Sequence, residues 1–141
     1  EEAQRQLTKE SGLKGLSGIS NDIREIAEAK GKGDARAKLA TDVFVASARH
    51  WIGGYFLGLN GADAVVFTAG IGENSADIRE SICVNLENLG VKLDTQKNNS
   101  VRATEAVISA PDSRVKIFVI PTNEELVVAR EAKRFLENKM N

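Results

Sequence analysis

A short apolar run that ends at two glycines constrains the fold of this chain more than any other stretch. Residues 64–68 read Ala-Val-Val-Phe-Thr, which is typical of a buried strand, and Gly70 and Gly72 follow one residue apart. The next segment is amphipathic, and its spacing predicts a helix over about residues 75–88. A strand, a glycine turn and a helix together direct backbone N–H groups at an anion or a nucleotide.

The glycine pattern by itself leaves two interpretations open. Glycine has no Cβ, so the backbone at Gly70 and Gly72 can take a positive φ and a ligand can approach it closely. The stretch lacks the Lys-Ser/Thr ending of a Walker loop and the third glycine of a dinucleotide fingerprint. A tight turn between a strand and a helix, with no ligand, therefore fits these residues equally well.

Alternating strands and helices predict an α/β fold with a mixed sheet flanked by helices. Residues 1–10 read as the end of a helix, and residues 11–20, rich in glycine and serine, as a packed-down loop. The other elements expected along the chain are helices at 23–29 and 35–59, a surface loop at 91–100, strands at 106–109 and 115–120, and a last helix from 122 to about 138.

The helix over 35–59 carries a wide apolar stripe and is expected to lie in the core. The stripe comprises Ala40, Phe44, Ala48, Trp51, Ile52, Tyr55 and Leu59. Trp51 and Tyr55 are therefore interpreted as packing residues rather than as a platform for a base. His50, the only histidine, has no partner at a recognisable spacing and is interpreted as a structural or surface residue. Cys83 is interpreted as a small buried hydrophobe.

Charge and composition exclude several classes of function. Nineteen Lys and Arg against 20 Asp and Glu give a formal net charge of −1, which implies no basic surface for nucleic acid. No apolar run approaches the roughly 20 residues that cross a bilayer. Cys83 is the only cysteine, so no intrachain disulfide can form, and we expect a cytoplasmic protein with neither a nucleic-acid nor a membrane partner.

Two further sets of polar residues each have a structural and a functional interpretation. Thr122 and Glu125 have the spacing of a capping box, which leaves Glu124 free in the first turn of the last helix. The Glu124 carboxylate then either interacts favourably with the helix dipole or helps hold Mg²⁺ near nucleotide phosphates. Asp22 and Arg24, at a predicted helix start, are either a cap and a surface charge or two groups turned to a ligand.

Four segments, in the same order, resemble the acetate kinase family. Residues 66–75 (Val-Phe-Thr-Ala-Gly-Ile-Gly-Glu-Asn-Ser) are similar to its adenosine motif. Residues 11–24 resemble its segment ending in Asp-x-Arg, residues 42–45 the start of its long helix, and residues 120–126 its carboxy-terminal signature. The match runs along the whole chain, so it is far more specific than any single motif.

The resemblance implies a fold, a reaction and an assembly. The fold is that of the superfamily of acetate and sugar kinases, heat-shock chaperones and actin, in which two ribonuclease-H-like domains close around a nucleotide. The reaction is transfer of the γ-phosphoryl group of ATP to acetate, which gives acetyl phosphate and ADP. The family's homodimer contact involves this domain, so a homodimer is expected.

The resemblance also implies roles for particular residues. Asp22, Ile23 and Arg24 would line the adenosine pocket. A second group would hold the nucleotide and comprises Gly70, Ile71, Gly72, Glu73 and Asn74. The backbone near Gly70 and Ile71 would pass close to the adenosine. Glu124 would be the carboxylate associated with Mg²⁺ or Mn²⁺.

Members of that family are longer than this chain, which resembles only their carboxy-terminal third. Residues 1–141 would then be a single, partial carboxy-terminal nucleotide-binding domain, without the amino-terminal domain and the first half of its own domain. The phosphate-gripping loop, the cationic groups that neutralise the transferring phosphoryl group, and the acetate pocket would lie outside it. We therefore expect no catalytic residue here, an inactive chain when alone, and an exposed sheet edge at 64–68.

Two alternative functions stay open. A propionate or butyrate kinase would share these motifs, because the acyl pocket lies outside the matching residues. A non-catalytic α/β domain would use the strand, glycine turn and helix only as elements of its fold. That second alternative predicts no nucleotide affinity and no effect of changes at Gly70, Gly72 or Arg24.

Overall fold

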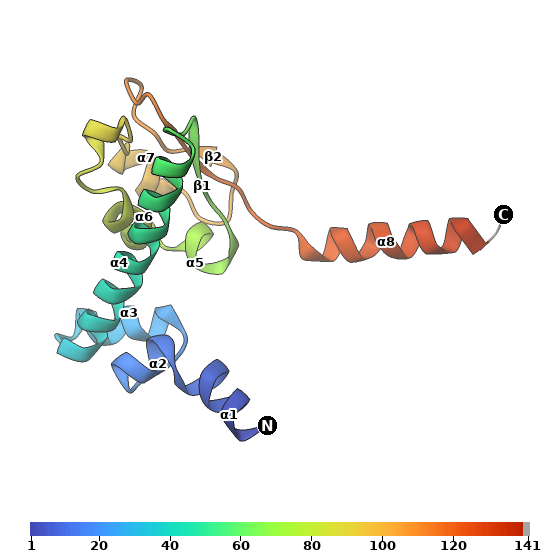
Figure 1. The fold of residues 1–141 in the computed structure, drawn as a ribbon, viewed down its shortest axis with the longest axis horizontal. Helices are drawn as coiled ribbons and strands as arrows, with labels where there is room; N and C mark the ends of the chain where they lie inside the picture. The colour runs from blue at the N-terminus through green and yellow to red at the C-terminus, as the bar shows by residue number, and fades with distance from the viewer. Residues whose placement is uncertain (140–141) are drawn as a thin grey trace.

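The computed structural model describes residues 1–139. In chain order the elements are α1 (Glu2–Arg5), the π-helical turn η1 (Gln6–Glu10), α2 (Gly12–Ser17), α3 (Ile23–Gly31), α4 (Ala35–Gly58), β1 (Ala64–Phe67), α5 (Ala69–Asn74), α6 (Ala76–Cys83), the 3₁₀ turn η2 (Glu87–Leu89), α7 (Thr95–Ser100), β2 (Ala106–Val107), β3 (Lys116–Val119) and α8 (Glu124–Lys139). Figure 1 shows α4 running from the amino-terminal helices to the sheet.

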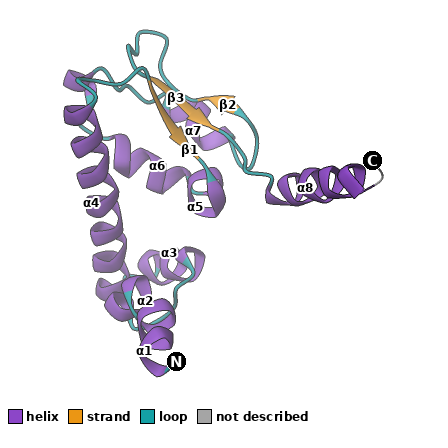
Figure 2. Cartoon of the chain, turned by 45° about the vertical axis from the view of Figure 1, so that its right-hand side comes forward, coloured by secondary structure: helices purple, strands orange, loops and turns teal. Residues whose placement is uncertain are grey.

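The three described strands form one mixed sheet in the order β1-β3-β2. β1 pairs parallel with β3, and β2 pairs antiparallel with β3, which therefore lies in the middle. The prediction of an α/β fold with a mixed sheet flanked by helices is confirmed, and Figure 2 shows the helices around the strands. β1 lies at an edge of the sheet, and Val66 and Val107 are about half exposed on it.

The main core lies where α6 packs on β1 and β3. Its buried members are Phe67, Ile78, Ile82, Cys83, Val91, Ile108, Val115, Ile117 and Val119. The interpretation of Cys83 as a buried hydrophobe is confirmed, because its side chain is in this cluster and burial raises the pKa of its thiol to about 11. The thiol therefore stays protonated at neutral pH.

One face of α4 packs against this core, as expected of a core helix. Phe44, Val45, Ala48, Ile52 and Phe56 supply that face. The prediction was wrong for the other aromatic residues of the stripe and for Leu59, because Trp51 and Tyr55 are 61% and 64% exposed and Leu59 is 70% exposed. Trp51 and Tyr55 each precede a packing residue by one position, and one residue turns a helix by about 100°. His50 is exposed beside Trp51.

A second, smaller core joins the amino-terminal helices to α4. Ile26, Ala37 and Ala40 are fully buried, and Leu13 and Leu16 pack against them. The prediction of a loop over 11–20 is therefore wrong in part, since residues Gly12–Ser17 form α2. The two leucines become buried only when this segment is helical, and that packing outweighs the poor helix propensity of its glycines.

The region after α6 also differs from its sequence-based description. The helix expected over 75–88 ends at Cys83, and Val84 is extended. Arg49 from α4 donates hydrogen bonds to the carbonyls of Ile82 and Val84 at 2.7 and 2.6 Å, which satisfies the carbonyl end of α6. Gly90, with a φ of 86°, ends the short turn η2 instead of α6.

The expected surface loop over 91–100 is instead part of the folded structure. Val91 is 1% exposed and forms a parallel bridge with Val115 beside the sheet. α7 follows, capped by Asp94, whose side chain accepts from the N–H of Lys97. Asn98 in α7 is fully buried. The polar composition predicted exposure, but the side chain of Asn98 accepts a hydrogen bond from the buried Arg79.

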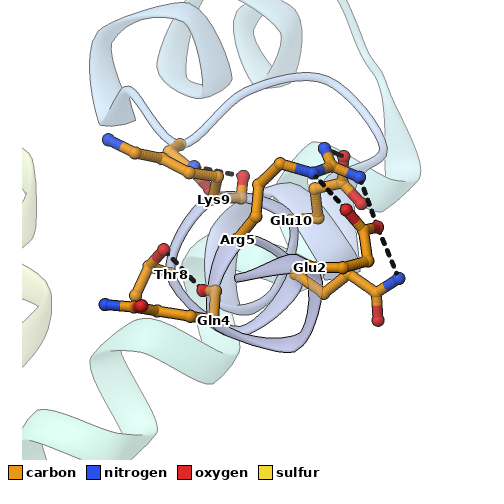
Figure 3. Close-up of polar contacts among 8 residues, drawn as sticks. Glu2, Gln4, Arg5, Thr8, Lys9 and Glu10 are labelled. Atoms are coloured by element: carbon orange, nitrogen blue, oxygen red, sulfur yellow. Dashed lines mark hydrogen bonds and ion pairs between the residues drawn. The ribbon is translucent and has the colours of Figure 1, made fainter.

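The two ends of the described chain are helical and exposed. Residues 1–10 are helical, as expected, and Figure 3 shows Arg5 bonded to Glu2 and Glu10, and the Thr8 hydroxyl donating to the Gln4 carbonyl at 2.7 Å. α8 stands away from the sheet in Figures 1 and 2, with several of its apolar side chains exposed. None of the helices in the described part combines the length and apolar character that a membrane crossing needs.

Candidate functional site

The glycine segment forms the short helix α5 rather than an open turn. Gly70 and Gly72 both lie inside α5, and neither has a positive φ. The left-handed residue is Ala69, with a φ of 59°, where the chain turns sharply from the end of β1. This conformation is uncommon outside glycine and costs free energy, so the surrounding contacts have to hold it.

The two glycines have different surroundings. A Cβ on Gly72 would lie 3.3 Å from the backbone carbon of Phe67, so glycine lets α5 pack closely over the end of β1. A Cβ on Gly70 would have no atom within 4 Å. Gly70 is exposed, as are Thr68 and Ala69 before it. The first turn of α5 thus presents accessible backbone, and its second glycine serves packing.

A buried arginine holds the far end of α5. Arg79 on α6 is 0% exposed and donates to the carbonyls of Gly72 and Glu73 at 2.9 and 3.0 Å. It also donates to Asn98 Oδ1 at 2.7 Å, and to the carbonyls of Asn98 and Val101 at 2.8 and 3.0 Å. Burial lowers the pKa of Arg79. Two of its acceptors are the last carbonyls of α5, where the helix dipole favours a cation.

Asn98 completes this arrangement from α7. Its side-chain amide donates to the carbonyl of Ala76 at 3.0 Å while its oxygen accepts from Arg79. Within residues 1–139, Arg79 has no ion-pair partner, so carbonyl and amide dipoles alone satisfy the buried guanidinium. Neither residue was a candidate from the sequence. The one signal is that Arg79 stands among Ile78, Ile82 and Cys83 on the apolar face of α6.

Glu73 joins α5 to the segment that precedes α8. Its carboxylate oxygen Oε1 accepts hydrogen bonds from the Thr122 N–H at 2.8 Å and from the Thr122 hydroxyl at 3.1 Å. Glu73 is 8% exposed. The predicted capping box between Thr122 and Glu125 is therefore wrong, because the Thr122 hydroxyl is engaged by Glu73. The cap of α8 is Asn123, whose Oδ1 accepts from the N–H of Leu126 at 2.9 Å.

The other two members of the predicted nucleotide segment differ in burial. Ile71 is partly buried and packs against the main core. Asn74 is exposed, and its Nδ2 donates to the carbonyl of Gly70 at 2.9 Å. The side chain of Asn74 therefore spans the exposed face of α5 and returns to the residue whose backbone is most open.

Asp22, Ile23 and Arg24 open α3. The Asp22 carboxylate accepts a hydrogen bond from the Arg24 N–H at 2.9 Å, which confirms the interpretation of Asp22 as a helix cap. It also accepts from Nε and Nη2 of Arg24 at 3.0 and 2.5 Å, and this guanidinium holds the pKa of Asp22 down to about 2. The Arg24 side chain is 87% exposed. Ile23 packs against the same main core as Ile71.

The fold thus brings the two predicted nucleotide segments to one side of α4. In Figures 1 and 2, α3 and α5 lie on the same side of that helix, at different heights along it. A surface depression of about 520 Å³ lies elsewhere, lined by residues of α3, α4 and α6 that include Lys30, Asp42 and Arg49. None of the candidate site residues lines it.

Glu124 is the first residue of α8, and its side chain lies outside the described part of the structure. Among the described residues no three His, Cys, Asp or Glu side chains are grouped as metal ligands.

Comparison with known proteins finds relatives that match almost the whole chain. A profile of the acetokinase family matches residues 1–130. The chain is 54% identical over 130 residues to the acetate kinase of Syntrophomonas wolfei, covering 92% of this chain and 32% of that protein. It is 52% identical over 134 residues to the acetate kinase of Methanosarcina thermophila, covering 95% of this chain and 33% of that protein. The chain thus spans about a third of the length of these curated relatives.

Solved structures show the same fold. The crystal structure of Porphyromonas gingivalis acetate kinase superposes with a TM-score of 0.86 at 38% identity, over 94% of this chain and 33% of that one. A propionate kinase from Francisella tularensis superposes with a TM-score of 0.80 at 44% identity, over 92% of this chain and 33% of that one. The expected partial fold of the acetate and sugar kinase superfamily is confirmed. On this sequence and structural similarity, the chain belongs to the acetokinase family.

Proposed function

We propose that this chain is the adenosine-binding, carboxy-terminal third of an acetate kinase, which transfers the γ-phosphoryl group of ATP to acetate and forms acetyl phosphate and ADP. The observation that carries the proposal is α5, whose first turn exposes the backbone at Gly70 while Arg79 holds its last carbonyls. A nucleotide bound through backbone groups needs such a rigid and accessible segment, because binding then costs little ordering of the protein.

The proposed nucleotide contacts come from two segments. The first is the segment of Gly70, Ile71, Gly72, Glu73 and Asn74, in which Gly70 offers exposed backbone and Asn74 an exposed amide beside it. Asp22, Ile23 and Arg24 form the second wall, in which Ile23 is fixed by the core and Arg24 is free to turn toward the adenine or ribose. A guanidinium can stack on a base and can also donate hydrogen bonds to a sugar.

We assign the metal-associated carboxylate to Glu124. Mg²⁺ in nucleotide sites is commonly held by one or two carboxylates together with phosphate oxygens and water, and we expect the same of Mg²⁺ or Mn²⁺ here. When bound, such a cation neutralises charge on the phosphates during transfer. Glu124 begins α8, so its carboxylate is carried by the first turn of a helix capped by Asn123.

Phosphoryl transfer needs cationic groups around the transferring phosphoryl group, and we place these, with the acetate pocket, on the rest of the polypeptide. In this proposal residues 1–141 form a partial carboxy-terminal nucleotide-binding domain that is inactive alone. An amino-terminal portion of the same protein completes it, and the whole protein is a cytoplasmic homodimer. Exposed apolar side chains support a larger assembly, with Val66 and Val107 on the sheet and Val127, Val128 and Phe135 on α8.

Propionate kinase is the second candidate, because a solved propionate kinase shares this fold at 44% identity. A butyrate kinase would share the same segment. Since the acyl pocket lies outside it in this proposal, rates of the full-length protein with acetate, propionate and butyrate separate the three. A non-catalytic domain is the remaining alternative, and it predicts no affinity for ADP.

The direct test is calorimetric titration of ADP, with and without Mg²⁺, into the full-length protein that carries this chain. Gly70→Val should weaken ADP binding by about tenfold or more, because the new side chain occupies the open space beside the exposed backbone. Gly54→Val is the matched control, since Gly54 in α4 also has no atom within 4 Å of an added Cβ. A folded wild-type protein that neither binds ADP nor forms acetyl phosphate would refute the proposal.

A further inference from the structure

We propose that Glu73 is a positioning residue whose buried carboxylate fixes the start of α8, and with it Glu124, relative to α5. The inference rests on the proposed function, in which α5 meets the nucleotide and Glu124 its metal ion. It assigns the side chain of Glu73 to a contact within the protein and not to the nucleotide.

The contact itself is specific. Both donors of Thr122, its N–H at 2.8 Å and its hydroxyl at 3.1 Å, reach the same carboxylate oxygen of Glu73. One bond fixes the Thr122 backbone and the other fixes its side-chain rotamer. Pro121, just before Thr122, has no N–H to offer, so Thr122 supplies the first backbone donor after Ile120. The pair joins residues 49 positions apart in the sequence.

The carboxylate is carried on a rigid support. The backbone carbonyl of Glu73 accepts from Arg79 Nη1 at 3.0 Å and from the Ala103 N–H at 3.2 Å. On the other side, the Ile120 N–H donates to the Phe67 carbonyl at 2.9 Å, which holds the chain against the end of β1. Thr122 is therefore tied to α5 just beyond the last contact of the chain with the sheet.

Because of its position, this contact determines where the first turn of α8 lies. Figures 1 and 2 show α8 projecting away from the sheet after a connecting segment. Thr122 lies in that segment, two residues before Glu124, and Asn123 between them caps the helix. A change at Glu73 would free the segment and displace the first turn of α8. The nucleotide-facing backbone of α5 would keep its shape, because Arg79 holds it independently.

The test uses the full-length protein with Glu73→Ala, Glu73→Gln and Thr122→Val, and Glu80→Ala as the control. Glu80 is an exposed glutamate on α6. Calorimetry gives the affinity for ADP in EDTA and in Mg²⁺, and kinetics gives kcat and the Mg²⁺ concentration at half-maximal rate. Thermal unfolding is recorded for each variant.

Glu73→Ala should raise the half-maximal Mg²⁺ concentration by about tenfold and lower kcat, with ADP affinity in EDTA within about twofold of wild type. Glu73→Gln should recover most of the loss, because its amide oxygen can accept the same two bonds. Thr122→Val should show a smaller effect in the same direction, since the backbone N–H remains. Glu80→Ala should match wild type.

Two results would overturn the inference. An equal loss of ADP affinity in EDTA for Glu73→Ala would make the carboxylate a nucleotide ligand. Unchanged Mg²⁺ dependence in Glu73→Ala and in Thr122→Val would remove the positioning role, and Thr122→Val carries the test if Glu73→Ala does not fold. Failure of the proposed function looks different, because the wild-type protein itself would then not bind ADP.

Discussion

The two segments proposed to meet the nucleotide are held in opposite ways. α5 is fixed from outside itself, by Arg79 at its last carbonyls and by the contact of Glu73 with Thr122. The start of α3 is fixed by its own residues, because Asp22 accepts from both the backbone and the side chain of Arg24. Figure 2 shows the two segments on the same side of α4.

This difference in how the segments are held fits their proposed contacts, because α5 is proposed to bind through its backbone and α3 through the side chain of Arg24. Backbone groups cannot be re-aimed without moving the chain, so a backbone site has to be rigid before the ligand arrives. A side chain can turn, and the Arg24 guanidinium, paired with Asp22 at the surface, can change partner at little cost because exposed ion pairs contribute little to stability. The account therefore predicts large stability effects at α5 and small ones at α3.

The largest expected effect is the loss of the Arg79 guanidinium. Arg79→Met should lower the free energy of unfolding by about 3–5 kcal/mol, because the buried hydrogen bonds of the guanidinium to four carbonyls and to the Asn98 side chain are lost. Urea unfolding of the full-length protein measures it, with Arg130→Met on the exposed face of α8 as the control. A loss no greater than that of the control would show that the guanidinium does not hold α5.

A smaller effect separates the two glycines of α5. Gly72→Ala should cost about 1–3 kcal/mol of stability, because its Cβ would press on the Phe67 backbone at 3.3 Å. Gly70→Ala should leave the unfolding midpoint nearly unchanged and still weaken ADP binding. Thermal unfolding and ADP calorimetry on both variants check this. Equal destabilisation by the two changes would contradict the packing described for α5.

The smallest stability effect is expected at Arg24. Arg24→Ala should leave the unfolding midpoint close to wild type while it weakens ADP binding, since the guanidinium is exposed and its partner is local. The measurement is again thermal unfolding paired with calorimetry, and Lys38→Ala, which removes another exposed cation of an ion pair, is the control. An ADP affinity unchanged by Arg24→Ala would remove α3 from the proposed site.

The same pair predicts a pH dependence. The pKa of Asp22 is lowered to about 2 in the folded protein by Arg24, from an ordinary value of 3.8. A lowered pKa means that the pair stabilises the fold above about pH 4 and that this contribution is lost as the pH falls toward 2. Carboxylate NMR titration should show the low midpoint in wild type and a higher one in Arg24→Ala, in which only the backbone N–H of residue 24 still donates to Asp22. An ordinary midpoint in wild type would contradict the pairing.

Local sequence signals predicted the elements whose cause is local. The apolar run at 64–67 forms β1, Asp22 caps α3, and the packing face of α4 repeats at helical spacing. These features depend on neighbouring residues alone. The order of the family motifs along the chain also led to the acetokinase family before any fold was known.

Three of the errors occur where distant residues meet. α2 forms because Leu13 and Leu16 pack on Ile26, and α7 is folded because Asn98 meets Arg79, 19 residues away. The capping box failed because Thr122 bonds to Glu73, 49 residues away, and left the cap to Asn123. Local composition contains no sign of such partners, so the residues that hold the candidate site were invisible to sequence reasoning.

Hydrogen–deuterium exchange of the full-length protein, with and without ADP, tests the central contrast most directly. The account predicts that the amides of residues 69–74 exchange slowly even without ligand and more slowly with ADP, because Arg79 and Glu73 already hold α5. The amides at the start of α3 should become protected mainly when ADP is bound. Fast exchange of residues 69–74 without ADP, or protection by ADP that falls outside both segments, would contradict the account.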